Sequence, residues 1–265
     1  MNGLIIACGR KDSLGNDRLM NPRGLMCFGK REVVAHIVGK MADVGVSSVR
    51  IIVEQGLRES YETVFKKQRP ACPVYIEEFS GLDSVSAYIY GALRFSRGRP
   101  LIAIADDNLF TFSLAPLVES ALRRDKSVLA VRDRSTIDGN PEKLNLGEVV
   151  IDQYGRIKRF RDSFTNAKKL HSRLIALDIW VFHPSTISLM TSLIKMNTPS
   201  AILIETFLNN LLCHEINEGF WADVGKKPLR RSADLYFSNG LCAETAAPMS
   251  LKALNMVRPS QSRHE

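Results

Sequence analysis

The stretch LIAIADDN at residues 101–108 decides the predicted fold of this chain. Its first five residues are all apolar, which is typical of a short strand that is buried on both faces of a parallel sheet. Asp106 and Asp107 follow that strand directly. Because ligands of open α/β sheets bind beyond the carboxyl ends of the strands, the stretch predicts a parallel sheet with two carboxylates at its ligand-binding edge.

The segments on both sides alternate between strand and helix patterns. Apolar and β-branched runs predict strands, whereas apolar residues at helical spacing predict helices. The predicted strands are residues 4–7, 49–53, 74–76, 128–131 and 175–182, the predicted helices are residues 33–44, 84–95 and 202–212, and residues 147–157 are a predicted hairpin. We therefore expect one α/β domain at residues 1–237, with a mostly parallel central sheet and helices on both faces. Residues 238–265 are polar and lack periodicity, so we expect a C-terminal tail or loosely docked segment there.

The composition indicates a globular protein without a nucleic-acid or membrane partner. Of the 265 residues, 45% are hydrophobic, which is enough for a packed core. The net charge of +8 comes from basic residues that are dispersed along the chain, so a solvated surface is a simpler interpretation than a nucleic-acid site. Five scattered cysteines without C-x-x-C spacing indicate reduced thiols, and the apolar N-terminus is too short to span a membrane. We therefore expect a cytoplasmic protein.

Three aspartates and one loop are the candidates for chemistry. Asp106 and Asp107 follow the apolar strand, and Asp223 lies in a separate turn with apolar neighbours. Two carboxylates from distant segments are what Mg²⁺ needs when phosphates and waters complete its coordination, although ordinary turn aspartates also cap helices. The polar loop at residues 9–22 could cradle phosphates or be an ordinary surface loop. Spacing alone leaves the alternatives for the aspartates open, and for the loop it favours the ordinary surface loop.

Taken in order, these segments resemble the sugar-1-phosphate nucleotidyltransferase family, which contains glucose-1-phosphate thymidylyl- and uridylyltransferases. The motifs keep the family's order and spacing over about residues 3–237. In the first part of the chain, LIIACGR at residues 4–10 resembles the strand leading into L-A-G-G-x-G-T-R, PRGLM at 22–26 resembles P-K-x-L-L, and SGL at 80–82 resembles the base-binding G-L-A. Further along, ADDNLF at 105–110 resembles L-G-D-N-L-F, GEVVID at 147–152 resembles Y-G-V-V-E-x-D, and GFWADVG at 219–225 resembles G-Y-W-x-D-I-G. The resemblance implies a Rossmann-like fold of the nucleotide-diphospho-sugar transferase type.

The resemblance also implies an activity and assigns roles to residues. Members of the family join a nucleoside triphosphate to a sugar 1-phosphate around a divalent metal and release pyrophosphate. The matching positions are Arg23, Asp107 and Asp223 for catalysis; Asp107 and Asp223 for Mg²⁺; Ala7, Cys8, Gly9, Arg10, Lys11, Gly81 and Asp106 for the nucleotide; and Gly147, Arg161 and Asp178 for the acceptor. The expected partners are a nucleoside triphosphate and a phosphorylated small-molecule acceptor, and assembly as a homo-oligomer is left open.

Four departures from the family's motifs fall at these sites. Lys11-Asp12-Ser13 stands where the family has G-T-R, Arg23 where it has its catalytic lysine, Arg161-Asp162-Ser163 where it has E-K-P, and Asp178 where it has a glycine. Both metal aspartates are retained, so we expect metal binding together with a rebuilt triphosphate grip and sugar pocket. We predict a Mg²⁺-dependent nucleotidyltransferase. A catalytically weak member that binds a nucleotide or sugar nucleotide as a regulatory subunit is the main alternative, and an unrelated α/β ligand-binding protein is the third.

Overall fold

A nine-stranded sheet forms the centre of the computed structural model, which describes residues 1–8, 22–79, 84–138, 144–161, 171–198 and 200–238. The strand order is β10-β9-β11-β6-β1-β4-β5, with β8 paired to β11 and β12 paired to β8. The strands are β1 (Asn2–Ala7), β4 (Val49–Val53), β5 (Val74–Glu78), β6 (Leu101–Ala105), β8 (Ser127–Asp133), β9 (Glu148–Ile151), β10 (Ile157–Arg161), β11 (Leu174–Phe182) and β12 (Leu211–Glu215). Two small ribbons, β2 (Cys27–Phe28) with β3 (Arg31–Glu32) and β7 (Asn108–Phe110) with β13 (Trp221–Asp223), lie outside it.

Four neighbouring strands, β6, β1, β4 and β5, run parallel, so their carboxyl ends meet at one edge of the sheet. In this parallel part Ile5 is paired with Ile51 on one side and with Ile104 on the other. β11 runs antiparallel to β6, β8 and β9. The sheet is therefore mixed, with a parallel centre that positions residues 106 and 107.

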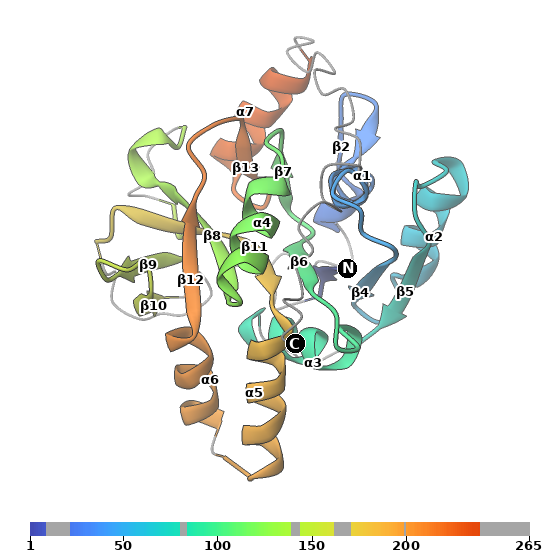
Figure 1. The fold of residues 1–265 in the computed structure, drawn as a ribbon. Coiled ribbons are helices and arrows are strands. Elements are labelled where there is room, and N and C mark those ends of the chain that lie inside the picture. The colour runs from blue at the N-terminus through green and yellow to red at the C-terminus, as the bar shows by residue number, and fades with distance from the viewer. Residues whose placement is uncertain (9–21, 80–83, 139–143, 162–170, 199, 239–265) are drawn as a thin grey trace, which may run out of the picture.

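Helices cover both faces because side chains alternate along the apolar strands. The helices are α1 (Val33–Ala42), α2 (Arg58–Lys67), α3 (Ser84–Phe95), α4 (Ala115–Arg124), α5 (Pro184–Lys195), α6 (Ser200–Asn209) and α7 (Lys227–Ser238). Ile5 packs in one core cluster with residues of α1, α2, α4 and α7, whereas Leu4 and Ile6 pack in the other with residues of α3, α5 and α6. Figure 1 shows α3, α5 and α6 together in the lower part of the view and α7 at the top. The predicted fold class is confirmed.

The structure differs from the predicted elements in two respects. The helix predicted for residues 202–212 ends at Asn209, and Leu211–Glu215 form β12 parallel to β8. Helical spacing continues through this segment, but Leu211 is buried beside Ser127, where pairing with the sheet satisfies the backbone. In addition, the described residues form the helices α2, α4, α5 and α7 and the two small ribbons, which were not predicted. The predicted hairpin forms as β9 and β10. Of the predicted tail at residues 238–265, Ser238 is the last residue of α7 and the rest lies outside the described residues.

None of the helices described here is long and apolar enough to cross a membrane.

Candidate active site

The ribbon of β7 and β13 brings Asp107 and Asp223 together from distant parts of the chain. β7 continues directly from the end of β6, and its first residue, Asn108, is paired with Asp223. The backbone amide of Val224 donates to the carbonyl of Asp107 at 2.9 Å. The indole N–H of Trp221 donates to Oδ1 of Asn108 at 2.7 Å, which holds the two strands in this register. The predicted pair of carboxylates is thus a product of backbone pairing rather than of two flexible loops.

Arg23 reaches Asp107 from a short 3₁₀ helix, η1 (Arg23–Leu25), whose position depends on Asp106. Oδ2 of Asp106 accepts hydrogen bonds from the amide of Gly24 at 3.0 Å and from the hydroxyl of Tyr61 at 2.8 Å. Nη1 of Arg23 then lies 2.8 Å from Oδ2 of Asp107, in an ion pair whose side chains are 9% and 8% exposed. A Cβ atom on Gly24 would stand 2.9 Å from the Asp106 carboxylate, so a glycine is required at this close approach.

Gly225 leaves the space that Arg23 occupies. A Cβ atom at this position would lie 2.4 Å from Nη1 of Arg23 and 2.8 Å from Oδ1 of Asp223. The amide of Gly225 also donates to Oδ1 of Asp223 at 2.8 Å. The absent side chain therefore allows the guanidinium to lie between the turn after β13 and the carboxylate of Asp107.

The charges of the cluster influence one another. Burial, with the neighbouring carboxylate of Asp107, raises the pKa of Asp223, against the opposing effects of Lys226 and Arg23. Burial acts to lower the pKa of Arg23, but Asp107, Asp223 and Asp106 outweigh it and raise the pKa overall. The guanidinium therefore stays cationic, and its charge offsets part of the cost of burying the Asp223 carboxylate.

The same two carboxylates fit a divalent cation. Asp107 and Asp223 offer hard oxygen donors, and burial together with the negative charge of Asp107 raises the pKa of Asp223, which a cation would offset. Among the described residues no group of three or more histidine, cysteine or acidic side chains is close enough to hold a metal. Two carboxylates suit an ion such as Mg²⁺, which is commonly held by one or two carboxylates together with phosphates and water.

A polar pocket opens in front of these carboxylates. Among the residues that line it are Asp107, Asn108, Gly147, Asp178, Trp221 and Asp223. Asp178 has a φ of 52°, in the left-handed region, at a bulge where the register of β11 against β8 shifts. Aspartate tolerates this conformation better than most residues, and the Tyr88 hydroxyl donates to the Asp178 carbonyl at 3.1 Å. A glycine, which the family has where this chain has Asp178, could adopt the same left-handed backbone conformation.

The structure places the other predicted site residues as follows. Ala7 and Cys8 are buried where β1 ends, beside Asp106, whose amide donates to the carbonyl of Ile6. Arg161 is buried, with its guanidinium hydrogen-bonded within the protein rather than extended into the pocket. Predicted nucleotide-binding residues outside the described part of the chain are Gly9, Arg10, Lys11 and Gly81.

Sequence reasoning did not single out three residues of this cluster. Tyr61 lies in the unpredicted helix α2 and had no motif to mark it. Gly24 and Gly225 lie inside the quoted motifs PRGLM and GFWADVG, so a signal existed, but a glycine in a motif does not reveal which side chain takes the space.

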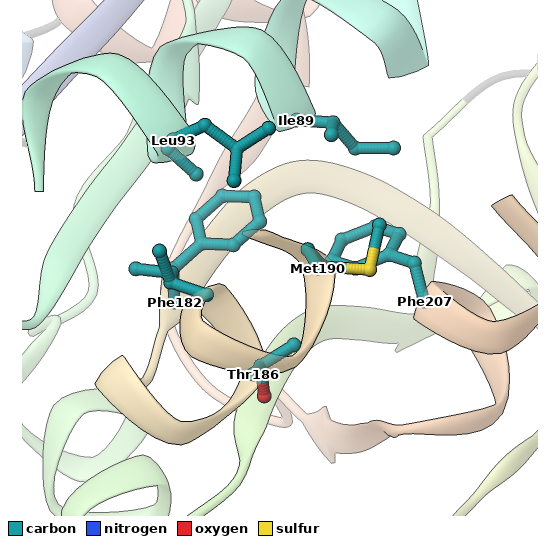
Figure 2. Close-up of a pocket in the computed structure, with 8 residues that line it drawn as sticks. Ile89, Leu93, Phe182, Thr186, Met190 and Phe207 are labelled. Atoms are coloured by element: carbon teal, nitrogen blue, oxygen red, sulfur yellow. The ribbon is translucent and has the colours of Figure 1, made fainter. Parts of the chain in front are cut away.

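A second hollow lies at the opposite end of the sheet, among α3, α5 and α6 (Figure 2). Ile89, Leu93, Phe182, Met190 and Phe207 surround it, with Thr186 as its polar residue. Phe182 is paired with Leu101, at the amino end of β6, whereas Asp107 follows the carboxyl end. The lining is almost entirely apolar, so this hollow offers little to a phosphorylated ligand.

The chain is similar to known proteins both in sequence and in fold. A family model described as nucleotidyl transferase matches residues 18–229. No protein with a curated description matches the chain. Many solved structures share the fold, three of which are compared with this chain. A Bacillus anthracis protein assigned as a glucose-1-phosphate thymidylyltransferase, in complex with a sucrose, has a TM-score of 0.68 at 17% identity, over 88% of this chain and 94% of that chain.

The other two structures give the same result. The inositol-1-phosphate CTP transferase from T. maritima has a TM-score of 0.64 at 15% identity, over 89% of this chain and 94% of that chain. A UDP-glucose pyrophosphorylase complexed with UDP-glucose has a TM-score of 0.64 at 14% identity, over 90% of this chain and 98% of that chain. At these identities the likeness establishes a common fold.

Proposed function

Because the chain belongs to the nucleotidyl transferase family, we propose that it joins a nucleoside triphosphate to a sugar 1-phosphate or a related phosphorylated acceptor, with release of pyrophosphate. The family match over residues 18–229 supports the transfer of a nucleotidyl group. The three similar structures are described by their activity on glucose 1-phosphate, inositol 1-phosphate or UDP-glucose. Their descriptions support a phosphorylated sugar or polyol as the acceptor.

One observation carries the proposal, namely the ion pair of Arg23 with Asp107 at 2.8 Å, beside Asp223. In the proposed reaction an oxygen of the acceptor phosphate attacks the α-phosphorus of the triphosphate. The bond from that phosphorus to the oxygen that bridges to the β-phosphate breaks, and its electron pair leaves with pyrophosphate. Both reactants are anions, so the protein contributes mainly by positioning them and neutralising their charge.

Each residue of the cluster has a role in this proposal. Arg23 donates to phosphate oxygens that gain charge during the transfer, and Asp106 positions the turn that carries Arg23. Asp107 and Asp223 would hold Mg²⁺, which supplies further neutralisation of the phosphates when bound. The proposed nucleotide site adjoins the end of β1 and includes Ala7, Cys8, Gly9, Arg10, Lys11 and Gly81. The proposed acceptor site is the pocket with Gly147 and Asp178, with Arg161 behind it.

The proposal is tested by a screen for pyrophosphate release. Each of the common nucleoside triphosphates is combined with a panel of sugar and polyol phosphates, with Mg²⁺ or with EDTA. We expect release with at least one pair, in Mg²⁺ only. If every pair fails while a triphosphate still binds, the transferase is rejected in favour of a binding subunit.

Two variants link the activity to the carboxylates. Asp107→Asn and Asp223→Asn should each abolish turnover and leave the circular dichroism spectrum unchanged, because the amide keeps the size but loses the charge that a metal needs. Asp43→Asn, at an exposed carboxylate beyond the end of α1, is the matched control and should keep full activity. Full activity in either site variant would remove that aspartate from the proposed site.

A further inference from the structure

A buried ionic triad lies behind the proposed acceptor pocket. Glu148 is 0% exposed and accepts from two arginines that are themselves buried, Arg134 and Arg161. Nε of Arg161 donates to Oε2 of Glu148 at 2.7 Å, and the guanidinium of Arg134 donates to Oε1. The three residues belong to different elements, the short helix η2 (Arg134–Thr136) after β8, the strand β9 and the end of β10. The triad thus ties three segments together at one point.

The remaining donors of Arg161 bond to one side of the pocket, which we call the pocket wall (residues 145–147). Nη1 of Arg161 donates to Oδ1 of Asn145 at 2.9 Å, and Nη2 donates to the carbonyl of Leu146 at 2.7 Å. Leu146 and Gly147 line the pocket. The carbonyl of Gly147 accepts from the amide of Ala176, which lines the pocket from β11. Arg161 is not itself among the residues that line the pocket, so it holds the wall from behind.

Stability alone does not account for such a triad. Removing charges from water is costly, and replacing a buried ionic group with apolar residues of similar volume is often neutral or stabilising. The surrounding strands are apolar, with Val149 and Ile175 buried next to Glu148, so an apolar side chain would suit this position of the sheet. What an apolar residue cannot do is orient the three donors of Arg161 toward fixed acceptors.

We propose that Glu148 is a positioning residue for the acceptor, which acts through Arg161 to fix the pocket wall. Arg161 influences the acceptor through Leu146 and Gly147, and not by direct contact. The inference rests on the proposed function, because it assigns the pocket to the phosphorylated acceptor. It predicts that the triad affects acceptor binding and leaves nucleotide binding unchanged.

The first test measures kinetics of Glu148→Gln with the triphosphate and acceptor that release most pyrophosphate. We expect the KM for the acceptor to rise about tenfold or more, and the KM for the triphosphate to stay within about twofold. Glu215→Gln is the matched control, because Glu215 also pairs with an arginine, Arg173, but on the surface. Equal effects on the two KM values in Glu148→Gln would overturn the proposal.

A second variant separates positioning from folding. Arg134→Met/Glu148→Leu/Arg161→Met replaces the whole triad with apolar side chains and should unfold at a denaturant concentration close to that of the wild type. The apolar side chains would then replace whatever the triad contributes to stability. The loss of acceptor affinity should persist, because the donors to Asn145 and Leu146 are gone. A wild-type acceptor KM in this stable variant would refute the assignment.

Amide hydrogen exchange of the protein without ligands gives a readout that does not depend on activity. The amide of Ala176, which donates to the carbonyl of Gly147, should exchange about tenfold faster or more in Glu148→Gln than in Glu215→Gln. Unchanged exchange would show that the triad does not hold the wall. If the wall loosens but no acceptor is ever turned over, the proposed function fails and the positioning role of Glu148 toward the wall is retained.

Discussion

Gly225→Ala should inactivate the proposed transferase although it replaces no charged residue. The added Cβ atom would lie 2.4 Å from Nη1 of Arg23, 2.6 Å from its Cζ and 2.8 Å from Oδ1 of Asp223. Relieving these overlaps requires a shift of about 1 Å in the guanidinium, since non-bonded heavy atoms rest roughly 3.5–4.0 Å apart. A shift of that size breaks the 2.8 Å ion pair of Arg23 with Asp107.

The expected magnitude follows from what is lost. Removing one preorganised donor from a developing charge costs about 3–4 kcal/mol, which corresponds to two or three tenfold steps in rate. Overpacking the turn should also lower the free energy of unfolding by about 1–3 kcal/mol. Pyrophosphate release measures the first effect, and urea unfolding followed by fluorescence measures the second.

Two controls show whether the methyl group acts through Arg23. Gly39→Ala in α1 adds a Cβ whose nearest neighbour is Arg31 at 3.6 Å, so it should be neutral or stabilise by about 0.5–1 kcal/mol and keep full activity. The double variant Arg23→Ala/Gly225→Ala should lose clearly less than the sum of the two single losses, because with Arg23 absent only the overlap with Oδ1 of Asp223 remains. A wild-type rate in Gly225→Ala, or additive losses in the double variant, would refute the reasoning.

Three further predictions concern the same region. Arg23→Ala should lower the rate of pyrophosphate release by about two or three tenfold steps, and Arg23→Lys should keep part of the activity; a robustly active Arg23→Ala would place the catalytic cation elsewhere. Burial lowers the pKa of His36 from 6.5 to about 4, so between these pH values the unfolded chain binds more protons than the folded protein. The free energy of unfolding should therefore fall as the pH drops through this window, by up to about 3 kcal/mol. His36→Gln, measured by urea unfolding across this range, should flatten that part of the profile, and an unchanged slope would contradict the assignment. Tyr61→Phe should cost about 1.5–3 kcal/mol of unfolding free energy, because it removes the 2.8 Å hydrogen bond to the buried carboxylate of Asp106, and a wild-type denaturation midpoint would count against it.

The parts of the fold that could be predicted are those with an unambiguous hydrophobic pattern. Residues 101–105 are apolar throughout and could only be buried, and the aspartates after them had to lie at the edge of the sheet. The same approach gave the wrong element for residues 211–215, because two apolar residues at the end of a helical pattern fit either a helix or a strand. These residues form a strand because they pair with the edge of β8, and this pairing is a tertiary contact.

The candidate site shows a similar division. Motif order indicated Asp107, Asp223 and Arg23, and the structure brings these residues together. Motif position could not indicate that Arg161 would bond to Glu148 and to residues 145–147, because those contacts depend on the three-dimensional course of β9 and β10. Side-chain direction inside a pocket is set by tertiary packing, which no local spacing encodes.

The pairing of β7 with β13 has a consequence for how the protein is made. Asp107 is synthesised less than halfway along the chain, but its neighbour Asp223 follows only after most of the sheet has been translated. Domains emerge from the ribosome N-terminus first, and contacts between distant residues close late. The parallel strands β1, β4, β5 and β6 are therefore available to pair well before the cluster of carboxylates can form. A nascent chain that stalls before residue 221 has neither the ribbon nor the pair of carboxylates, so the proposed transferase site is completed only late in synthesis.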